Sequence, residues 1–291
     1  MGFKQIALAL KLQKLSSAIN LNITRKFNGK KYIIPVINNI GFDNIFYKPD
    51  KFLLKLFDSL KLPSDSTFVD VGINVGQSLL NFVSCKENRY IGFEPNPNCN
   101  FYLNKLIHYN KLDNVRIIPV GLSSENSIGK FFITKFIDSS ATMIEGLRPG
   151  FYDKNKVTYI PLFAFDQLEL ENLGSISLIK IDVEGGELEV ISGMKNSIRK
   201  YNPIIICEVL DYHSSEVSEV LQERADKLTS VIKDLEYKIY QIQHSENGKI
   251  SLFEIEELKL IQWTEKSYDL NDYIFLPKNT LPSTIFRSDA L

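Results

Sequence analysis

The sequence predicts an α/β fold with a mostly parallel central sheet, helices on both faces and an antiparallel hairpin near the C-terminus. Strand-like runs rich in β-branched residues alternate with helical patterns over residues 65–212, which is typical of a parallel sheet with crossover helices. Beyond that region, Asn247-Gly248 separates two strand-like runs, and this dipeptide is a strong hairpin signal. Mixed sheets often carry such antiparallel strands at one edge.

We expect a single domain over residues 1–291, because no internal repeat or low-complexity linker divides the chain. Residues 1–64 predict an N-terminal helical extension with one short extended piece around Tyr32–Ile37. The core spans residues 65–212 and carries an insertion at about 122–173. Residues 213–291 supply a long helix and the strands that complete the sheet.

Hydrophobic periodicity places the individual elements. An apolar stripe predicts a helix over Lys51–Leu60, and Asn96 followed by Pro97 suits a helix cap and first turn. The core strands are expected at 68–71, 90–93, 115–120, 176–181 and 203–209, and its helices at 76–85, 97–110 and 185–199. The insertion predicts strands at 131–137 and 157–162. The C-terminal part predicts a helix near 217–235 and strands at 237–243, 249–255 and 272–276.

Composition excludes several function classes. The 291 residues are 44% apolar with a formal net charge of −1, so the chain as a whole attracts neither nucleic acid nor an anionic membrane. The three cysteines are scattered without metal-ligand spacing, which favours a reducing, cytoplasmic location. No run approaches the roughly 18 apolar residues that a transmembrane helix needs.

Two polar or amphipathic segments are expected at the surface. Phe3–Leu15 is a short amphipathic segment with three lysines, and we expect it to pack on the domain rather than lie on a membrane. In the insertion, Ser139–Thr142 and Arg148–Gly150 read as exposed loop.

A glycine turn after the first core strand is typical of a nucleotide-binding site. The strand Phe68–Val71 ends at Gly72, which lets the backbone turn sharply, and Gly76 opens the next helix. A helix N-terminus aimed at a crevice offers unpaired backbone N–H groups to a ligand. Asn74 stands where the dinucleotide turn G-x-G-x-x-G has its second glycine, so the spacing argues against a pyrophosphate.

Polar residues follow most core strands at their carboxyl ends, where open α/β sheets bind their ligands, and Gly121 and Leu122 follow the third strand. Glu94 follows the second strand, and an acidic side chain there can accept hydrogen bonds from both ribose hydroxyls. Asp182, Glu184 and Glu208 follow the fourth and fifth strands. Together with the turn, this set favours an adenosine without a pyrophosphate, which points to S-adenosylmethionine.

The sequence resembles the FkbM-type S-adenosylmethionine-dependent methyltransferases. The resemblance covers roughly residues 65–212, and its most specific part is the run Lys180-Ile181-Asp182-Val183-Glu184-Gly185. The other matching stretches are Val69–Gly76, Gly92–Pro97, Asn110 with Asp113–Val115, and Pro203–Glu208. The resemblance implies a Rossmann-like class I methyltransferase that methylates a hydroxyl on a sugar, a glycan or another small molecule.

By position, the resemblance implies that the glycine turn wraps the cofactor, that Glu94 holds the ribose and that Gly121-Leu122 borders the adenine. The candidate cofactor-binding set is Asp70, Gly72, Asn74, Gly76, Ser78, Glu94, Asn96, Gly121, Leu122 and Asp182. Asp70 is expected to shape the turn rather than touch substrate. The chain departs from the family at Ala164-Phe165-Asp166-Gln167, where a Thr-Leu-Asp-Asp-like run is common.

Methyl transfer to a hydroxyl requires alignment of the acceptor and removal of its proton. Asp182 ends a strand beside the cofactor turn and is the best-placed group for a catalytic or cofactor-orienting role; the alternative is a helix cap. Glu184 and Glu208 are further candidates, and His213 is a candidate general base. A divalent metal between two carboxylates is possible but not favoured, because no third ligand is evident.

Two other functions remain open from the residues. A nicotinamide-dependent oxidoreductase is disfavoured by the glycine spacing. A non-catalytic Rossmann-like binding module is disfavoured by three carboxylates converging on one rim. Ile181–Glu184 lacks the polar-Pro-Pro-aromatic run of nucleic-acid amino methyltransferases, so we expect a small-molecule or carbohydrate acceptor and no nucleic-acid partner.

Overall fold

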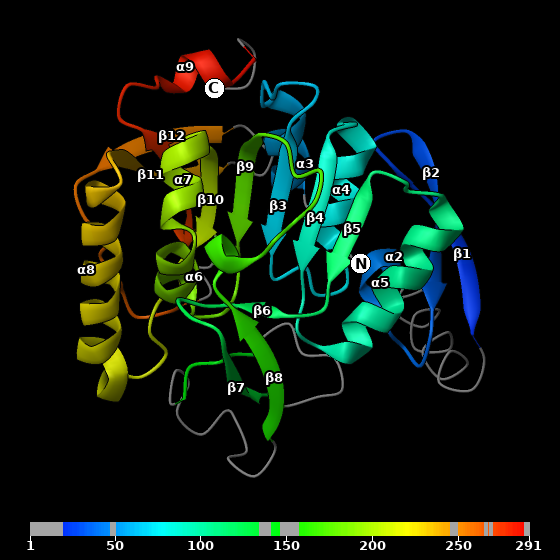
Figure 1. The fold of residues 1–291 in the computed structure, drawn as a ribbon, viewed down its shortest axis with the longest axis horizontal. Coiled ribbons are helices and arrows are strands. Elements are labelled where there is room, and N and C mark those ends of the chain that lie inside the picture. The colour runs from blue at the N-terminus through cyan, green and yellow to red at the C-terminus, as the bar shows by residue number, and fades with distance from the viewer. Residues whose placement is uncertain are drawn as a thin grey trace.

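The computed structural model describes residues 20–46, 51–133, 141–145, 157–244, 250–264, 267 and 270–287. Figure 1 shows an eight-stranded central sheet with helices on both faces, a small sheet below its lower edge and a hairpin at one side. This arrangement confirms the predicted fold class. In the part of the chain that is described, no helix is long and apolar enough to cross a membrane.

The central sheet has the strand order β12-β11-β13-β10-β9-β3-β4-β5. The pairs from β10 to β5 are all parallel, whereas β13 lies antiparallel between β10 and β11, and β12 is antiparallel to β11. The strands are β3 (Thr67–Val71), β4 (Arg89–Phe93), β5 (Val115–Ile118), β9 (Ile176–Ile181), β10 (Ile204–Glu208), β11 (Tyr237–His244), β12 (Ile250–Ile255) and β13 (Asp272–Pro277). The expected pairing of the two C-terminal strands is present, although their turn lies outside the described residues.

Helices cover the two faces of this sheet and bury a separate hydrophobic core on each. Successive residues of a strand point to opposite faces, so Phe68 packs with one core and Val69 with the other. The first face carries α3 (Lys51–Ser59), α4 (Gln77–Cys85) and α5 (Pro97–Asn110); the second carries α6 (Glu187–Gly193), α7 (Lys195–Tyr201) and α8 (Ser218–Asp234). Short helices are α2 (Phe42–Phe46), α9 (Pro282–Ile285), η1 (Phe165–Gln167) and η2 (Ser215–Val217).

The extended piece predicted at Tyr32–Ile37 is present within β2 (Lys30–Val36). The helical expectation is wrong for the segment before it, where β1 (Leu21–Phe27) pairs with β2 in an antiparallel hairpin. Asn28 and Gly29 turn between them with φ angles of 44° and 79°, the left-handed conformation that an Asn-Gly turn needs. The Tyr32 hydroxyl donates to the Val83 carbonyl at 3.0 Å, which fastens the hairpin to α4.

The helix expected over residues 185–199 is interrupted at Met194, between α6 and α7. A Cβ on Gly193 would lie 2.0 Å from the Ser123 carbonyl oxygen, so the helix passes too close to another loop to carry a side chain there. The insertion strands β6 (Gly121–Leu122), β7 (Ser127–Phe132) and β8 (Val157–Phe163) form a separate sheet in the order β6-β8-β7. The predicted strand at 131–137 therefore begins earlier, and residues 134–140 lie outside the described part.

Candidate functional site

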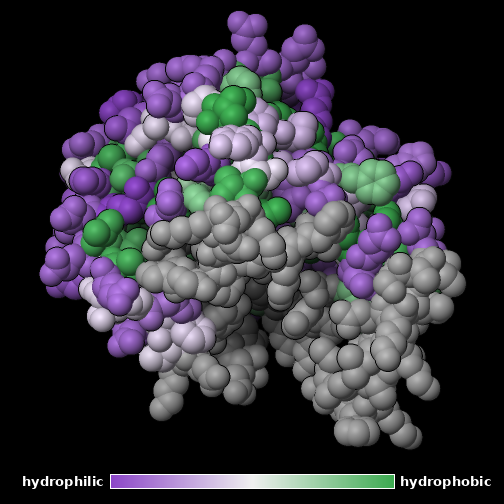
Figure 2. Space-filling model, turned by 90° about the horizontal axis from the view of Figure 1, so that it is seen from below, coloured by the Kyte–Doolittle hydropathy of each residue, from purple (hydrophilic) through white to green (hydrophobic). Residues whose placement is uncertain are grey.

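The parallel strands β3, β4, β9 and β10 end at one edge of the central sheet, facing β6 and the insertion (Figure 1). The predicted site residues that follow these strands therefore gather at this edge. Figure 2 views the molecule from this side, where the coloured surface is mainly hydrophilic with small separate hydrophobic groups.

The turn after β3 is held tightly by its two neighbouring strands. Gly72 has a φ of 88°, and its N–H donates to the Phe93 carbonyl at 2.9 Å. A Cβ at this position would lie 1.9 Å from the Asp182 carbonyl oxygen. Asn74 and Gly76 also adopt left-handed conformations, and Gly76 is the N-cap residue of α4. Glycine at position 72 is thus required by the close approach of the loop after β9.

Glu94 is buried at the end of β4, with 5% of its surface exposed. Its two carboxylate oxygens accept hydrogen bonds from the backbone N–H of Asn74, at 2.8 Å, and of Asn96, at 2.7 Å. Burial raises the pKa of Glu94 to about 7, against the effect of these two amides. Asn96 caps α5 by accepting from the Asn98 N–H at 3.0 Å. Glu94 therefore joins the turn after β3 to the start of α5.

Asp70 lies beneath the turn and is fully buried. One carboxylate oxygen accepts hydrogen bonds from the hydroxyls of Ser78, at 2.5 Å, and Tyr90. Burial raises the pKa of Asp70, while the nearby Lys180 ammonium and the two hydroxyls lower it. Asp70 therefore joins the start of α4 to β4 beneath the turn, through side-chain hydroxyls.

Lys180 is a polar site residue that the residue-by-residue reasoning did not select. It faces Asp70 across the β3–β9 pairing, is only 7% exposed, and its ammonium donates to Asp182 at 2.8 Å. Burial would lower the pKa of Lys180, but Asp182 and Asp70 outweigh that effect and raise it above its ordinary value. A lysine between isoleucines in a mostly apolar strand was the available signal.

The structure brings the three predicted carboxylates after β9 and β10 together. Asp182, Asp272 and Glu184 all act on Glu208, whose pKa is raised well above its ordinary value first by burial and then by these negative charges. Glu208 and Asp272 are directly paired across β10 and β13. In the described ranges, no group of three or more His, Cys, Asp or Glu side chains is arranged to hold a metal ion.

The insertion contacts the loop after β9 through Thr142. This side chain is 1% exposed, and its hydroxyl donates to the Glu184 carbonyl at 2.5 Å. Thr142 also pairs with Phe132 by two backbone hydrogen bonds of 2.9 and 3.2 Å. The prediction of an exposed loop is therefore wrong at Thr142, because a β-bridge and a buried hydroxyl bond anchor it. Residues 139, 140 and 148–150 lie outside the described part.

Three further predicted residues lie in β6 and in the loop after β10. Gly121 and Leu122 form β6, where Leu122 is 1% exposed and a Cβ on Gly121 would lie 2.7 Å from the Leu162 side chain. His213 is exposed in the loop after β10, and its ring stacks on that of Trp263 with the centroids 5.0 Å apart.

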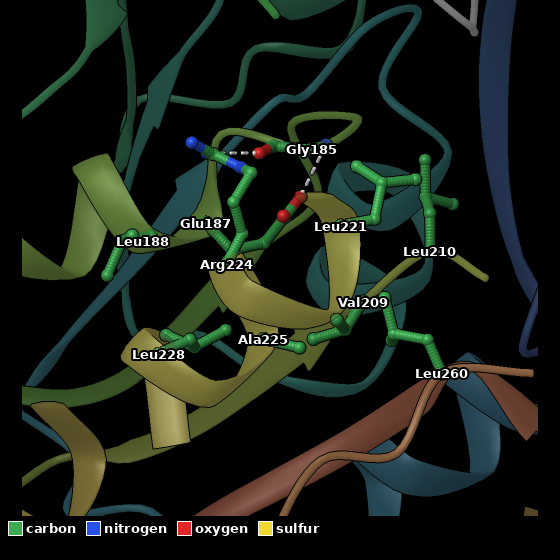
Figure 3. Close-up of a pocket in the computed structure, with 10 residues that line it drawn as sticks. All are labelled: Gly185, Glu187, Leu188, Val209, Leu210, Leu221, Arg224, Ala225, Leu228 and Leu260. Atoms are coloured by element: carbon green, nitrogen blue, oxygen red, sulfur yellow. Dashed lines mark hydrogen bonds between the residues drawn. The ribbon is translucent and has the colours of Figure 1, made fainter. Parts of the chain in front are cut away.

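A small cavity lies between α6 and α8, next to the loop after β9 (Figure 3). At its mouth, Arg224 of α8 donates to the Gly185 carbonyl at 2.9 Å and to Glu189 at 2.6 Å. Glu187 accepts from the Gly185 N–H at 2.8 Å, and burial raises its pKa to about 7. The remaining wall is apolar and consists of Leu188, Val209, Leu210, Leu221, Ala225, Leu228 and Leu260.

Comparisons with known proteins identify the family. The family model described as Methyltransferase FkbM domain matches residues 70–279. Methyltransferase sdnD of Sordaria araneosa is 29% identical over 167 residues, which cover 47% of this chain and 64% of sdnD, just under two thirds of that relative. Hexuronic acid methyltransferase AglP of Haloferax volcanii is 24% identical over 184 residues, covering 62% of this chain and 72% of AglP.

Solved structures include methyltransferase FkbM from Methylobacillus flagellatus KT, with 16% identity and a TM-score of 0.43 over 74% of this chain and 44% of that one. Fibrillarin from Aeropyrum pernix, solved with bound S-adenosyl-L-methionine, has 11% identity and a TM-score of 0.42 over 88% of this chain and 82% of that one.

Proposed function

The chain belongs to the FkbM methyltransferase family, and we propose that it transfers a methyl group from S-adenosylmethionine to a hydroxyl of a sugar or another small molecule. The observation that carries this proposal is the hydrogen bonding between Glu94 and the backbone at the glycine turn. Each carboxylate oxygen of Glu94 accepts a hydrogen bond from one backbone N–H, at 2.8 and 2.7 Å. Each also keeps a lone pair that can accept a hydrogen bond from a ribose hydroxyl.

The charges at the edge also fit this cofactor. S-adenosylmethionine supplies an activated methyl group on a positively charged sulfur. Asp182, Glu184 and Glu208 place negative charge at the ends of β9 and β10, and a positive sulfonium is attracted to such a rim. In this proposal the turn Gly72–Gly76 binds the cofactor, Asn96 and Ser78 support it, and Gly121 and Leu122 border the adenine.

In this proposal Asp182 orients the cofactor and accepts the proton of the acceptor hydroxyl. Its carboxylate is held at 2.8 Å by the buried Lys180 ammonium, so Lys180 acts as a positioning residue. Glu208 is the second candidate proton acceptor, because burial and three neighbouring carboxylates raise its pKa. A raised pKa makes a carboxylate a stronger base. His213, stacked on Trp263, is better placed to contact an acceptor than to take its proton.

The name of AglP supports a sugar-derived acceptor, since it describes a methyltransferase for a hexuronic acid. A nicotinamide-dependent oxidoreductase and a non-catalytic binding module make different predictions from ours. We expect S-adenosylhomocysteine to raise the melting temperature and NADH to leave it unchanged. A labelled-methyl transfer assay against sugars, glycosides, lipids and peptides then identifies the acceptor. Stabilisation by NADH alone would contradict the proposed function.

A further inference from the structure

Two loops at the carboxyl edge place aromatic rings beside the proposed site. Tyr212 and His213 follow β10, and Trp263 follows β12. The rings of His213 and Trp263 lie 5.0 Å apart at an interplanar angle of 29°, so they stack face to face. His213 is exposed and Trp263 is half-buried, which leaves part of this aromatic pair open to a ligand.

The two loops form one rigid frame. The Tyr212 N–H donates to the Ile261 carbonyl at 3.2 Å, and the Trp263 N–H donates to the Tyr212 carbonyl at 2.9 Å. Asp211 adds a third link by accepting from the Ile261 N–H at 2.9 Å. Asp211 is 6% exposed, and within the described part of the chain no donor reaches its second oxygen. The frame therefore holds the aromatic pair in place before any ligand arrives.

Residues that flank this frame and a residue of the loop after β9 line the same cavity. The cavity in Figure 3 is lined by Gly185, which follows the predicted catalytic residues, and by Leu210 and Leu260, which flank the two loops. The charges of Asp182 and Glu184 raise the pKa of Glu208, which precedes His213 by a few residues in the sequence. An acceptor seated on the aromatic pair would thus reach toward the ends of β9 and β10.

We propose that Tyr212, His213 and Trp263 form an acceptor subsite that binds the ring of a neutral sugar. The face of an aromatic ring carries partial negative charge, so the C–H groups of a sugar ring pack favourably against it. Asp182 is paired with Lys180 and the pKa of Glu208 is raised, so the negative charge that disfavours an acceptor with its own carboxylate comes mainly from Glu184 and Asp272. This inference rests on the proposed function. A preference for a neutral sugar would distinguish this chain from an enzyme that methylates a uronic acid.

Trp263 is the single tryptophan of the chain, so its fluorescence reports on this subsite alone. We would titrate the protein, saturated with S-adenosylhomocysteine, with methyl glycosides of glucose, galactose, mannose and rhamnose, and with methyl glucuronide. At least one neutral glycoside should change the fluorescence saturably and bind about tenfold more tightly than the glucuronide, a difference of roughly 1.4 kcal/mol. No change with any glycoside, or preference for the glucuronide, contradicts the subsite.

The substitutions Trp263→Ala and Trp263→Phe separate this inference from the proposed function. With an acceptor found in the transfer assay, Trp263→Ala should raise the acceptor KM about tenfold, and Trp263→Phe should restore most of it because the aromatic face returns. Stabilisation by S-adenosylhomocysteine should be the same in both. The matched control is Tyr159→Ala, an exposed aromatic residue of β8. An unchanged KM in Trp263→Ala overturns the subsite but leaves the methyltransferase proposal standing.

Discussion

The turn after β3 and the loop after β9 lie at the same edge of the sheet, but they are held by different parts of the chain. The turn after β3 is bonded to the next strand, through Gly72 to Phe93 and through Asn74 to Glu94. The loop after β9 is bonded to the insertion through Thr142 and to α8 through Arg224. The turn after β3, the proposed cofactor half, is thus held mainly by the local β3–α4–β4 unit, with one link to the next loop through the Asp182 N–H, which donates to the Val71 carbonyl at 3.0 Å. The loop after β9, part of the proposed acceptor half, depends in addition on the distant insertion and on α8.

Lys180 connects the two halves, because it faces Asp70 and donates to Asp182. Substituting it should therefore have the largest effect on both halves. Lys180→Met leaves Asp70 and Asp182 without their cation, and loss of one partner from a buried pair should lower the free energy of unfolding by about 3 kcal/mol. The pKa values of Asp70 and Glu208, which burial already raises, should rise further without the ammonium. Urea unfolding checks the first effect, and a shift of the acid limb of kcat to higher pH checks the second.

Lys180→Arg is the control, since it keeps the charge and should restore much of the activity. If Lys180→Met loses stability but keeps both its kcat and its pH profile, Lys180 is merely structural and does not position Asp182.

Gly72 tests how closely the two halves are packed. In Gly72→Ala, the added Cβ would lie 1.9 Å from the Asp182 carbonyl oxygen and would also force alanine to a φ of 88°. We expect a loss of about 2–3 kcal/mol in the free energy of unfolding, from overpacking together with the strained φ. The matched control is Gly29→Ala, where φ is 79° but nothing lies within 4 Å of the added atom. Equal losses in the two variants would show that the contact with Asp182 is unimportant.

The local origin of the cofactor half explains how much of it was predictable. Glu94 and the glycine turn could be placed because each lies at the end of a short, clearly patterned strand. The role of Lys180 could not, because it depends on the β3–β9 pairing that sets it opposite Asp70. The need for glycine at position 193 likewise depends on the close approach of the distant Ser123. The N-terminal hairpin, in contrast, could have been predicted from the sequence. Asn28-Gly29 is the same turn signal that identified the C-terminal hairpin.

Glu94 gives the cofactor half its own pH dependence. Its pKa is raised from 4.5 to about 7, so its contribution to folding stability is present below pH 4.5 and is lost as pH rises through about 7. Ribose hydroxyls donate to the ionised carboxylate, so binding of S-adenosylhomocysteine should strengthen as pH rises toward 7, by up to about tenfold per pH unit. Calorimetric titration across this range measures the effect. Glu94→Gln should bind weakly with a flat pH profile; a flat profile in the wild type would remove Glu94 from the cofactor site.

Thr142 tests whether the insertion acts on the acceptor half alone. Thr142→Val keeps the shape of the side chain but removes the hydroxyl that donates to the Glu184 carbonyl at 2.5 Å and accepts from the Ile144 N–H at 3.0 Å. Each of these two lost hydrogen bonds costs about 1 kcal/mol, and the one to Glu184 bears on the loop after β9. We expect kcat to fall about fivefold while the affinity for S-adenosylhomocysteine stays the same, because the turn after β3 has no contact with Thr142 among the hydrogen bonds that hold it. Thr142→Ser retains the hydroxyl and should keep most of the activity. A matching fall in cofactor affinity would mean that the two halves are coupled through the insertion, and that the separation drawn from their hydrogen bonds does not hold.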